Sequence, residues 1–386
     1  MYKRILDKII CPNSGTTDVK IYSVELNRQS KSEKNLQEEN ILPDDDIKSG
    51  IIYTSDKKYV YVIHEYIPIL LNDADQDLVH LNSIAATLKN QLPNDLADAF
   101  QNTINRIAAQ HHSEDGDWNR EEMKYYDSAV DTEKQREAML KSIRNENLWR
   151  IFIPRRESMI KYLEKNCKGK WIFEIGCGNA RTVSRIFNPA EFGYNYIGTD
   201  ISFKRLMVAK MAIPGSDFIQ ASALNIPIKN NFFDAAISFG MLHHLPRPTD
   251  AFAEVDKKLK PEAIFTLHEP VYTTRQFSEK QTEMVRKLFR TYEHSDHDNK
   301  INLKETKEEL NKLNYQILTI APYNSLFRVV YEAVMNRIYK PWHKNKGIMQ
   351  TVLVLDNVLL NTVVKLSNKL GPQAIVITSA KKKIAQ

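Results

Sequence analysis

The sequence predicts an α/β protein with a Rossmann-like, mostly parallel sheet, and two observations carry this prediction. After Gly169, short runs of β-branched and aromatic residues alternate with helical patterns, as they do in strand–helix–strand units. The first of these strands ends in a glycine-rich turn, Gly176-Cys177-Gly178, that opens onto a helix. At 386 residues, the chain has the length of two or three domains.

Residues 1–74 are expected to form a small β-rich domain. Short β-branched and aromatic runs at Ile51–Tyr53, Lys58–Ile63 and Ile67–Leu71 are separated by turn residues, which is typical of strands. Before them, Asn27–Asp46 is rich in Ser, Glu, Gln, Asn and Asp, and we expect a mobile loop there.

Residues 75–165 are expected to form a helical connector that also supplies a lid. Apolar residues recur there at three- and four-residue spacing. The polar segment His111–Glu122 contains Gly116 and is predicted to interrupt the helices.

Residues 166–386 carry the predicted α/β domain, with a helical insertion at 322–372. One face of the insertion is apolar and favours a buried core or a homodimer helix over contact with a membrane surface or a greasy substrate. The expected strands are Trp171–Ile175, Tyr194–Asp200, Asp217–Gln220, Phe233–Ser238, Ala263–His268, Tyr315–Ile320 and Ala374–Ser379, and the expected helices are Ala180–Phe187, Phe203–Met211 and Thr249–Leu259.

Composition places the chain among soluble globular proteins, with 42% hydrophobic and 26% charged residues. The net charge of +6, part of it in Lys381–Lys383, is a weak argument for nucleic acid and favours a solvated tail. Three scattered cysteines fit a reducing compartment. Asp7 and Lys8 interrupt any secretory signal, and polar residues interrupt the most apolar later stretch, so we expect a cytoplasmic protein without a membrane span.

The turn after the first strand predicts a nucleotide site, because backbone amides can approach a ligand closely where side chains are missing. In a dinucleotide fingerprint the third glycine would fall at Arg181, and no carboxylate would stand at Glu174. That carboxylate would repel phosphate and attract the ammonium and sulfonium groups of S-adenosylmethionine. The alternatives are a tight turn without a ligand and a half-exposed charge at a strand end.

Asp200 ends the second strand, twenty-two residues after Gly178. An acidic residue at this place can accept hydrogen bonds from a ribose diol. The alternative is a simple helix cap made by Asp200-Ile201-Ser202.

From Met123 to His268 the sequence resembles the class I S-adenosylmethionine-dependent methyltransferases, in their small-molecule branch with a seven-stranded sheet. The markers are Glu174-Ile175-Gly176-Cys177-Gly178, Gly198-Thr199-Asp200-Ile201-Ser202, Asn225-Ile226-Pro227-Ile228 followed by Phe233-Asp234, and Gly240-Met241-Leu242-His243-His244-Leu245.

This resemblance implies S-adenosyl-L-methionine as the cofactor and assigns residues to its parts. Members of the family often have an aspartate where this chain has Ser222. A serine hydroxyl can still bond the exocyclic amine of adenine, in a weaker or differently oriented contact. The implied set is Glu174, Gly176, Cys177 and Gly178 at the methionine end, Asp200 and Ile201 at the ribose and adenine, Ser222, Ala223 and Leu224 beside the adenine ring, Phe239 and Gly240 at the sulfonium, and Tyr126 within the lid segment Tyr125-Tyr126-Asp127.

Candidate catalytic residues follow the fourth and fifth strands. His243 or His244 could take a proton from a hydroxyl or amine substrate, and Glu269 is a further candidate. The alternative for the histidines is packing or capping at a helix start. Methyl transfer is an in-line displacement, so positioning and exclusion of water can supply much of the catalysis.

The amino-terminal residues resemble the small zinc-ribbon-like domain related to activator subunits of translation-factor and tRNA methyltransferases, through Ile5–Pro12 and His64–Leu71. Of the paired cysteines that hold zinc in such domains only Cys11 is present, with Ser14 at the second position, so we expect a packing or docking module without metal. Glu293–Asp298 has metal-binding residue types at no recognised spacing and is expected to be a polar loop.

The leading hypothesis is a methyltransferase that acts on an O, N or C nucleophile of a small-molecule, lipid or sugar-linked substrate. A second hypothesis is methylation of RNA or protein, which the modest charge disfavours. Phe239-Gly240-Met241-Leu242 disfavours it too, because it stands where an Asn-Pro-Pro-Tyr-like motif would be. A third is a cofactor-binding scaffold without catalysis.

Overall fold

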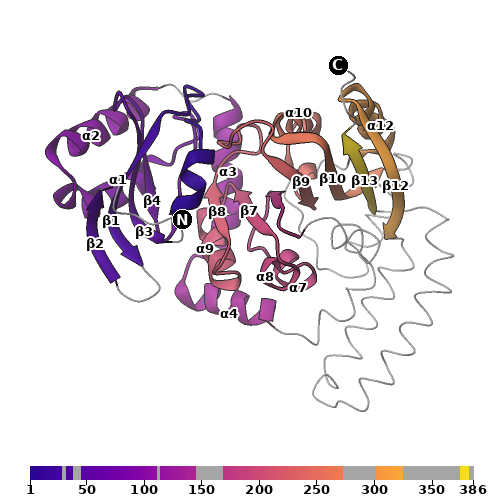
Figure 1. Ribbon diagram of the computed structural model, residues 1–386, viewed down its shortest axis with the longest axis horizontal. Helices are drawn as coiled ribbons and strands as arrows, with labels where there is room; N and C mark the ends of the chain where they lie inside the picture. Colours follow the sequence, from indigo (N-terminus) through magenta and orange to yellow (C-terminus); the bar gives the residue numbers. More distant parts are fainter. Residues whose placement is uncertain are drawn as a thin grey trace, which may run out of the picture. The chain divides into compact units, whose positions relative to one another are not determined.

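The computed structural model describes residues 1–27, 32–37, 45–110, 114–144, 168–272, 301–324 and 374–381 (Figure 1). These residues divide between two compact units. The first contains Met1–Arg144, Cys167–Asp234 and Glu254–Lys260, and the second contains the other described residues. The amino-terminal region therefore shares a compact unit with the first strands of the α/β domain.

An antiparallel sheet occupies the amino-terminal region, with the strand order β2-β1-β3-β4-β5. It follows a short 3-10 helix, η1 (Lys3–Lys8). At Gly50 of β3 the neighbouring strand is so close that a Cβ would lie 2.4 Å from the carbonyl oxygen of Tyr22, so only glycine fits. The strands are β1 (Val19–Asn27), β2 (Ser32–Gln37), β3 (Asp46–Thr54), β4 (Val60–His64) and β5 (Ile67–Pro68).

The predicted loop at Asn27–Asp46 is wrong over Ser32–Gln37, which forms β2 and pairs antiparallel with β1. Main-chain groups make this pairing, and any sequence supplies them. A polar composition therefore did not identify the strand. The rest of the loop lies mostly outside the described residues.

The amino-terminal region continues the pairing at the edge of the α/β sheet. Ile69 forms a parallel bridge with Gln220, and the N–H of Leu70 donates to the carbonyl of Gln220 at 2.9 Å. Ile9 pairs with Ile228 nearby. These contacts cover strand β8 (Asp217–Gln220), whose edge would otherwise be open.

The connector contains α1 (Leu78–Leu88), η3 (Lys89–Gln91), α2 (Asn94–Ala109), α3 (Glu114–Ser128) and α4 (Glu133–Arg144). The predicted interruption at His111–Glu122 is wrong from Glu114 onward, because α3 runs through it. Asn119, Glu122 and Met123 are buried, so tertiary contacts outweigh the weak helix propensity of this segment.

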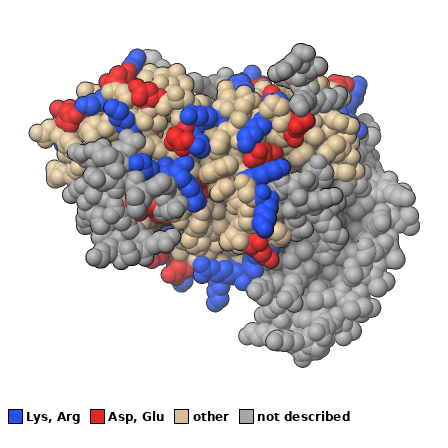
Figure 2. All heavy atoms as spheres, viewed as in Figure 1, with Lys and Arg blue, Asp and Glu red and all other residues tan. Residues whose placement is uncertain are grey.

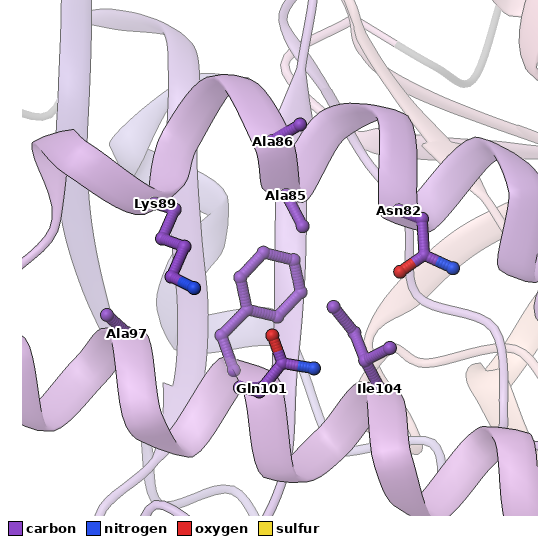
Figure 3. A pocket seen from close by; sticks show the side chains of 8 residues that line it. Asn82, Ala85, Ala86, Lys89, Ala97, Gln101 and Ile104 are labelled. Carbon is purple, nitrogen blue, oxygen red and sulfur yellow. The ribbon is translucent and has the colours of Figure 1, made fainter.

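A small pocket opens between α1 and α2 (Figure 3). Its volume of about 160 Å³ is below the roughly 300–1,000 Å³ typical of ligand pockets. It is lined by Asn82, Ala85, Ala86, Lys89, Ala97, Phe100, Gln101 and Ile104.

In the first unit, three parallel strands stand in the order β6 (Trp171–Ile175), β7 (Asn195–Asp200) and β8. Helices α7 (Val183–Ile186), α8 (Pro189–Phe192) and α9 (Phe203–Ala212) connect or follow them. The helix predicted from Ala180 begins only at Val183, because Ala180 has a φ of 52°, outside the helical region.

The remaining strands, most of whose residues belong to the second unit, have the order β12-β13-β10-β9, and β11 pairs with β10. β13 is antiparallel to both β10 and β12. The order continues through β6, β7 and β8, so the main path of the sheet has seven strands and β11 adds an eighth at β10. The predicted α/β class with a seven-stranded, Rossmann-like sheet is confirmed. The elements are β9 (Phe233–Phe239), η5 (Leu242–His244), α10 (Pro248–Lys258), β10 (Leu259–Tyr272), β11 (Ile301–Asn302), α12 (Leu303–Lys312), β12 (Tyr315–Asn324) and β13 (Ala374–Lys381).

The helical insertion predicted at 322–372 falls mostly outside the described residues, and residues 322–324 belong to β12. Within the described ranges, no helix has the length and apolar character needed to cross a membrane.

Candidate active site

The glycine turn after β6 is held against the end of β7. Gly176 and Gly178 have φ values of 65° and 53°, a conformation that favours glycine. The N–H of Cys177 donates to the Thr199 carbonyl at 2.8 Å, and the N–H of Gly178 donates to Asp200 Oδ2 at 2.7 Å. The predicted turn residues and Asp200 therefore lie together, in a loop whose backbone approaches a strand-end carboxylate.

Asp200 is partly exposed, and its two oxygens accept hydrogen bonds from the N–H groups of Gly178 and Ser202, the latter at 2.8 Å. Desolvation by the surrounding protein raises the pKa of Asp200 above 3.8, against the opposing effects of these bonds and of Arg205. The cap of α9 is Ser202, whose hydroxyl accepts the N–H of Arg205. Asp200 is thus not the cap residue itself, and its oxygens keep lone pairs for a ligand.

Glu174 is only 2% exposed and does not fit the alternative of a half-exposed strand-end charge. The hydroxyl of Tyr196, on the neighbouring strand, donates to Glu174 Oε2. Gly198 makes room for this arrangement, because a Cβ there would lie 2.7 Å from Cys177 Sγ and 3.0 Å from the Tyr196 hydroxyl. Burial raises the pKa of both Cys177 and Tyr196 well above their ordinary values, which keeps both groups neutral.

The segment Tyr125-Tyr126-Asp127, predicted to be a lid, lies at the end of α3 and contacts the start of α9. The Arg205 guanidinium lies 4.0 Å from the ring centroid of Tyr126, a cation–π contact. Asp127 accepts hydrogen bonds from the Ser202 hydroxyl and from the Lys204 N–H. Tyr126 therefore lies beside Arg205, which in turn approaches Gly178: a Cβ there would be 3.8 Å from Arg205 Nη1.

Ser222 follows β8 and is 4% exposed, while Ala223 and Leu224 are partly buried beside it. Its hydroxyl oxygen accepts the N–H of Leu224 at 3.2 Å and lies 3.5 Å from Asn119 Nδ2. The carbonyl of Ile201 accepts a hydrogen bond from Gln220 Nε2 at 2.8 Å.

Sequence reasoning missed Asn119, Tyr196 and Arg205, which contact the predicted residues. Asn119 is 103 positions from Ser222, and Tyr196 is 22 positions from Glu174. Arg205 is the only one of the three with a local signal, since it lies in the first turn of the helix after Asp200.

In the second unit, four predicted residues lie at the end of β9 and in the segment that follows it. Gly240 has a φ of 68°, and its N–H donates to the His268 carbonyl at 2.8 Å. Phe239 precedes it and is partly buried. His243 and His244 follow in η5, with ring centroids 4.0 Å apart.

Glu269, on β10, is fully buried and fastens this turn. Its Oε1 accepts hydrogen bonds from the Ser238 hydroxyl at 2.9 Å and from the N–H groups of Met241 and Leu242, both at 3.1 Å. Its Oε2 lies 2.9 Å from His243 Nδ1. Because an ionised carboxylate only accepts, the imidazole proton is on Nδ1 and the lone pair of neutral His243 is on Nε2. These bonds favour a positioning role for Glu269.

Among the described residues, no group of three or more His, Cys, Asp or Glu side chains could hold a metal ion. Cys11 is buried, with its Sγ 3.2 Å from the Tyr61 hydroxyl and 3.4 Å from the Ser14 N–H. Glu293–Asp298 lies outside the described residues.

Residues 173–267 match a family model described as a methyltransferase domain. This match confirms the methyltransferase domain expected from the sequence and covers the glycine turn, Asp200, Ser222 and the two histidines.

The alignments with curated relatives cover about a quarter of this chain. They include a tRNA (carboxymethyluridine(34)-5-O)-methyltransferase of Arabidopsis thaliana, 35% identical over 103 residues, which are 26% of this chain and 24% of the relative. A fatty-acid O-methyltransferase of Mycolicibacterium smegmatis is 30% identical over 106 residues, 26% of this chain and 38% of the relative. The chain thus spans between a quarter and two fifths of the length of these relatives.

A solved structure of the YcgJ protein from Bacillus subtilis aligns over 60% of this chain and 99% of its own, with 17% identity and a TM-score of 0.39. A Haemonchus contortus phosphoethanolamine N-methyltransferase 2, solved with phosphomonomethylethanolamine and S-adenosylhomocysteine, aligns over 59% of this chain and 52% of its own, with 17% identity and a TM-score of 0.39.

Proposed function

We propose that the chain is an S-adenosyl-L-methionine-dependent methyltransferase. The observation that carries the proposal is the joined arrangement of the glycine turn with Asp200 inside a region that matches the methyltransferase domain model. Two acids on adjacent parallel strands and a glycine-rich turn, whose Cys177 side chain is buried, suit a ligand that carries both a ribose and positive charge.

The residues of the first unit fit this cofactor in their order along the sheet. Adjacent strands lie about 4.8 Å apart, so the ends of β6, β7 and β8 offer three successive positions over about 10 Å. Glu174 and the glycine turn would hold the methionine end, Asp200 the ribose, and Ser222 the adenine side. Glu174 and Tyr196 also share one hydrogen bond, which fixes the carboxylate before any ligand arrives.

The bound cofactor would supply an electrophilic methyl group, and the protein would position the nucleophile and exclude water. His243 is our candidate for accepting a proton, because Glu269 directs the lone pair of its neutral ring to Nε2. His244 and Glu269 stay predictions as catalytic residues, the latter with a positioning role favoured.

For the substrate we propose a small molecule, a lipid or a sugar-linked compound methylated at O, N or C. The fatty-acid O-methyltransferase among the relatives supports a lipid or small-molecule acceptor. We further propose that residues 1–74 are a docking or packing module, that 75–165 carry the lid, and that the protein is cytoplasmic.

RNA methylation is the second candidate, and the tRNA methyltransferase relative is the observation that favours it. On the face of the described residues that Figure 2 shows, basic and acidic side chains are interspersed, and this face gives the candidate no further support. Filter binding to RNA at varied salt separates the two, because RNA binding weakens steeply with salt.

Isothermal titration with S-adenosylmethionine, S-adenosylhomocysteine and NAD tests the proposal. We expect both sulfur compounds to bind and NAD to bind more weakly. Asp200→Ala should weaken S-adenosylhomocysteine about 100-fold, since it removes hydrogen bonds to a charged acceptor. Asp234→Ala, on a carboxylate that binds Lys260 and the Trp171 N–H, is the matched control. Tighter binding of NAD, or affinity that Asp200→Ala leaves unchanged, would overturn the proposal; binding without methyl transfer to any acceptor would favour the scaffold alternative.

A further inference from the structure

The adenine side of the site contains a side chain that the family resemblance does not assign. Ser222 stands where related enzymes often have an aspartate, and a serine hydroxyl is a short group. Its oxygen already accepts the N–H of Leu224. The buried side chain next to it is Asn119 of α3, 6% exposed, with Nδ2 3.5 Å from the Ser222 hydroxyl oxygen.

We propose that Asn119 Oδ1 accepts a hydrogen bond from the 6-amino group of the adenine ring, and that Asp75 holds Asn119 in the orientation that allows it. This inference rests on the proposed function, because it names the residue that selects adenine in the same cofactor site.

Asp75 determines which end of the Asn119 amide is the acceptor end. Asn119 Nδ2 donates to Asp75 Oδ1 at 2.8 Å, and Asp75 is 4% exposed. A carboxylate cannot donate, so the amide nitrogen must face it. The same nitrogen faces the Ser222 hydroxyl, and the carbonyl end of the amide, Oδ1, is the acceptor that the arrangement leaves to a ligand.

Helix α3 carries two side chains that contact the proposed ribose and adenine positions. Tyr126 lies seven residues after Asn119, which is two helical turns or about 10.5 Å, so both side chains are on the same side of the helix. Tyr126 contacts Arg205 near Asp200, and Asn119 contacts Ser222. Arg205 follows β7 and Ser222 follows β8, and these two strands are neighbours in the sheet. One helix thus contacts the segments after both strand ends, which are the proposed ribose and adenine positions.

The consequence is that base recognition depends on residues outside the region that matches the family model. Asp75 and Asn119 both precede residue 173. The amino-terminal region also contacts the strand that precedes Ser222. The N–H of Leu70 donates to the Gln220 carbonyl, and the side chain of Gln220 donates to the Ile201 carbonyl.

The experiment compares two ligands that differ at the Watson–Crick edge of the purine: S-adenosylhomocysteine has a 6-amino group and an unprotonated N1, and S-inosylhomocysteine has a 6-carbonyl and a proton on N1. Kd values for both are measured by titration calorimetry for the full chain. The selectivity ratio is the Kd of S-inosylhomocysteine divided by the Kd of S-adenosylhomocysteine, and we expect it to exceed one for the wild type. Asn119→Ala should lower this ratio about tenfold, because it removes one hydrogen bond to the amino compound and one repulsive contact with the carbonyl compound. The ratio cancels any loss of folded protein that affects both ligands.

Asp75→Asn keeps the shape of the side chain but allows the Asn119 amide to turn over, so we expect it to lower the ratio by a smaller factor, about threefold. Asn102→Ala, on an exposed position of α2, is the control and should leave the ratio unchanged. If Asn119→Ala weakens both ligands equally, or Asp75→Asn leaves the ratio at the wild-type value, the inference is overturned and the proposed function stands. If the wild type binds neither ligand, the proposed function itself fails.

Discussion

Asp200 and Glu269 are two carboxylates on strands of the α/β domain, and their hydrogen bonds differ in number. Asp200 is partly exposed and accepts two main-chain N–H groups. Glu269 is fully buried and has four partners, from Ser238, Met241, Leu242 and His243. A carboxylate has about four lone-pair sites.

The comparison teaches how a strand-end acid can be assigned a role. Glu269 is fully buried, and three of its four bonds converge on Oε1, so its carboxylate serves the turn that carries His243 and is shielded from a substrate. Asp200 is partly exposed, and each of its oxygens accepts one main-chain N–H, so each can accept a further bond from a ribose hydroxyl. Residue type and position alone do not separate these roles, whereas the exposure of the carboxylate and the placing of its donors do.

The largest effect should come from Glu269→Ala, which leaves buried donors unpaired. We expect it to lower the free energy of unfolding by about 3–5 kcal/mol in urea denaturation. Asp200→Ala should cost only about 1–2 kcal/mol, because its two donors lie nearer to water. Glu269→Gln is the matched control: its amide oxygen can still accept three of the bonds, so it should lose less than the alanine variant. Equal losses for Glu269→Ala and Asp200→Ala would break the comparison.

A second effect follows from the raised pKa of Asp200. The ionised carboxylate accepts hydrogen bonds from the ribose, and protonation removes part of that capacity. The affinity for S-adenosylhomocysteine should therefore fall as the pH is lowered. The fall should begin at a higher pH than it would for an aspartate with the ordinary pKa of 3.8. Below the pKa of Asp200, the affinity should fall by up to about tenfold for each pH unit. Titration calorimetry from pH 8 down to pH 4, close to the ordinary pKa of an aspartate, measures this.

Asp200→Asn provides the control for the pH series, since its amide does not titrate. Its affinity should be lower at pH 8 and nearly constant with pH. A wild-type affinity that stays flat throughout would show that Asp200 does not hold the ligand.

The smallest effect concerns Tyr196, which orients Glu174 as Glu269 orients His243. Tyr196→Phe removes one buried hydrogen bond worth about 1 kcal/mol, so the Kd for S-adenosylmethionine should rise about fivefold. Tyr194→Phe, on a hydroxyl that donates to the Phe187 carbonyl, is the control and should leave the Kd unchanged. A higher Kd in the control and an unchanged Kd in Tyr196→Phe would place the methionine end elsewhere.

Local patterns in the sequence were enough for the strand order from Trp171 to Phe239, for helices α9 and α10, for the glycine turn and for Asp200, whereas the short helix α8 was not predicted. Alternating apolar runs report the burial of neighbouring residues, and Gly176 and Gly178 report a backbone conformation that other residues avoid. These signals come from residues close together in the chain, and the sequence displays them directly.

Tertiary structure alone decided the rest. β2 forms through main-chain pairing, and α3 persists because Asn119, Glu122 and Met123 are buried. Ser222 acquires Asn119 as a neighbour from 103 positions away, and Asn119 in turn bonds Asp75, 44 positions away. The hydrogen-bond count of Glu269 likewise depends on donors 26 to 31 positions earlier. Such contacts exist only after distant segments pack together, because a side chain's type fixes how many bonds it can make but not which partners folding brings within reach.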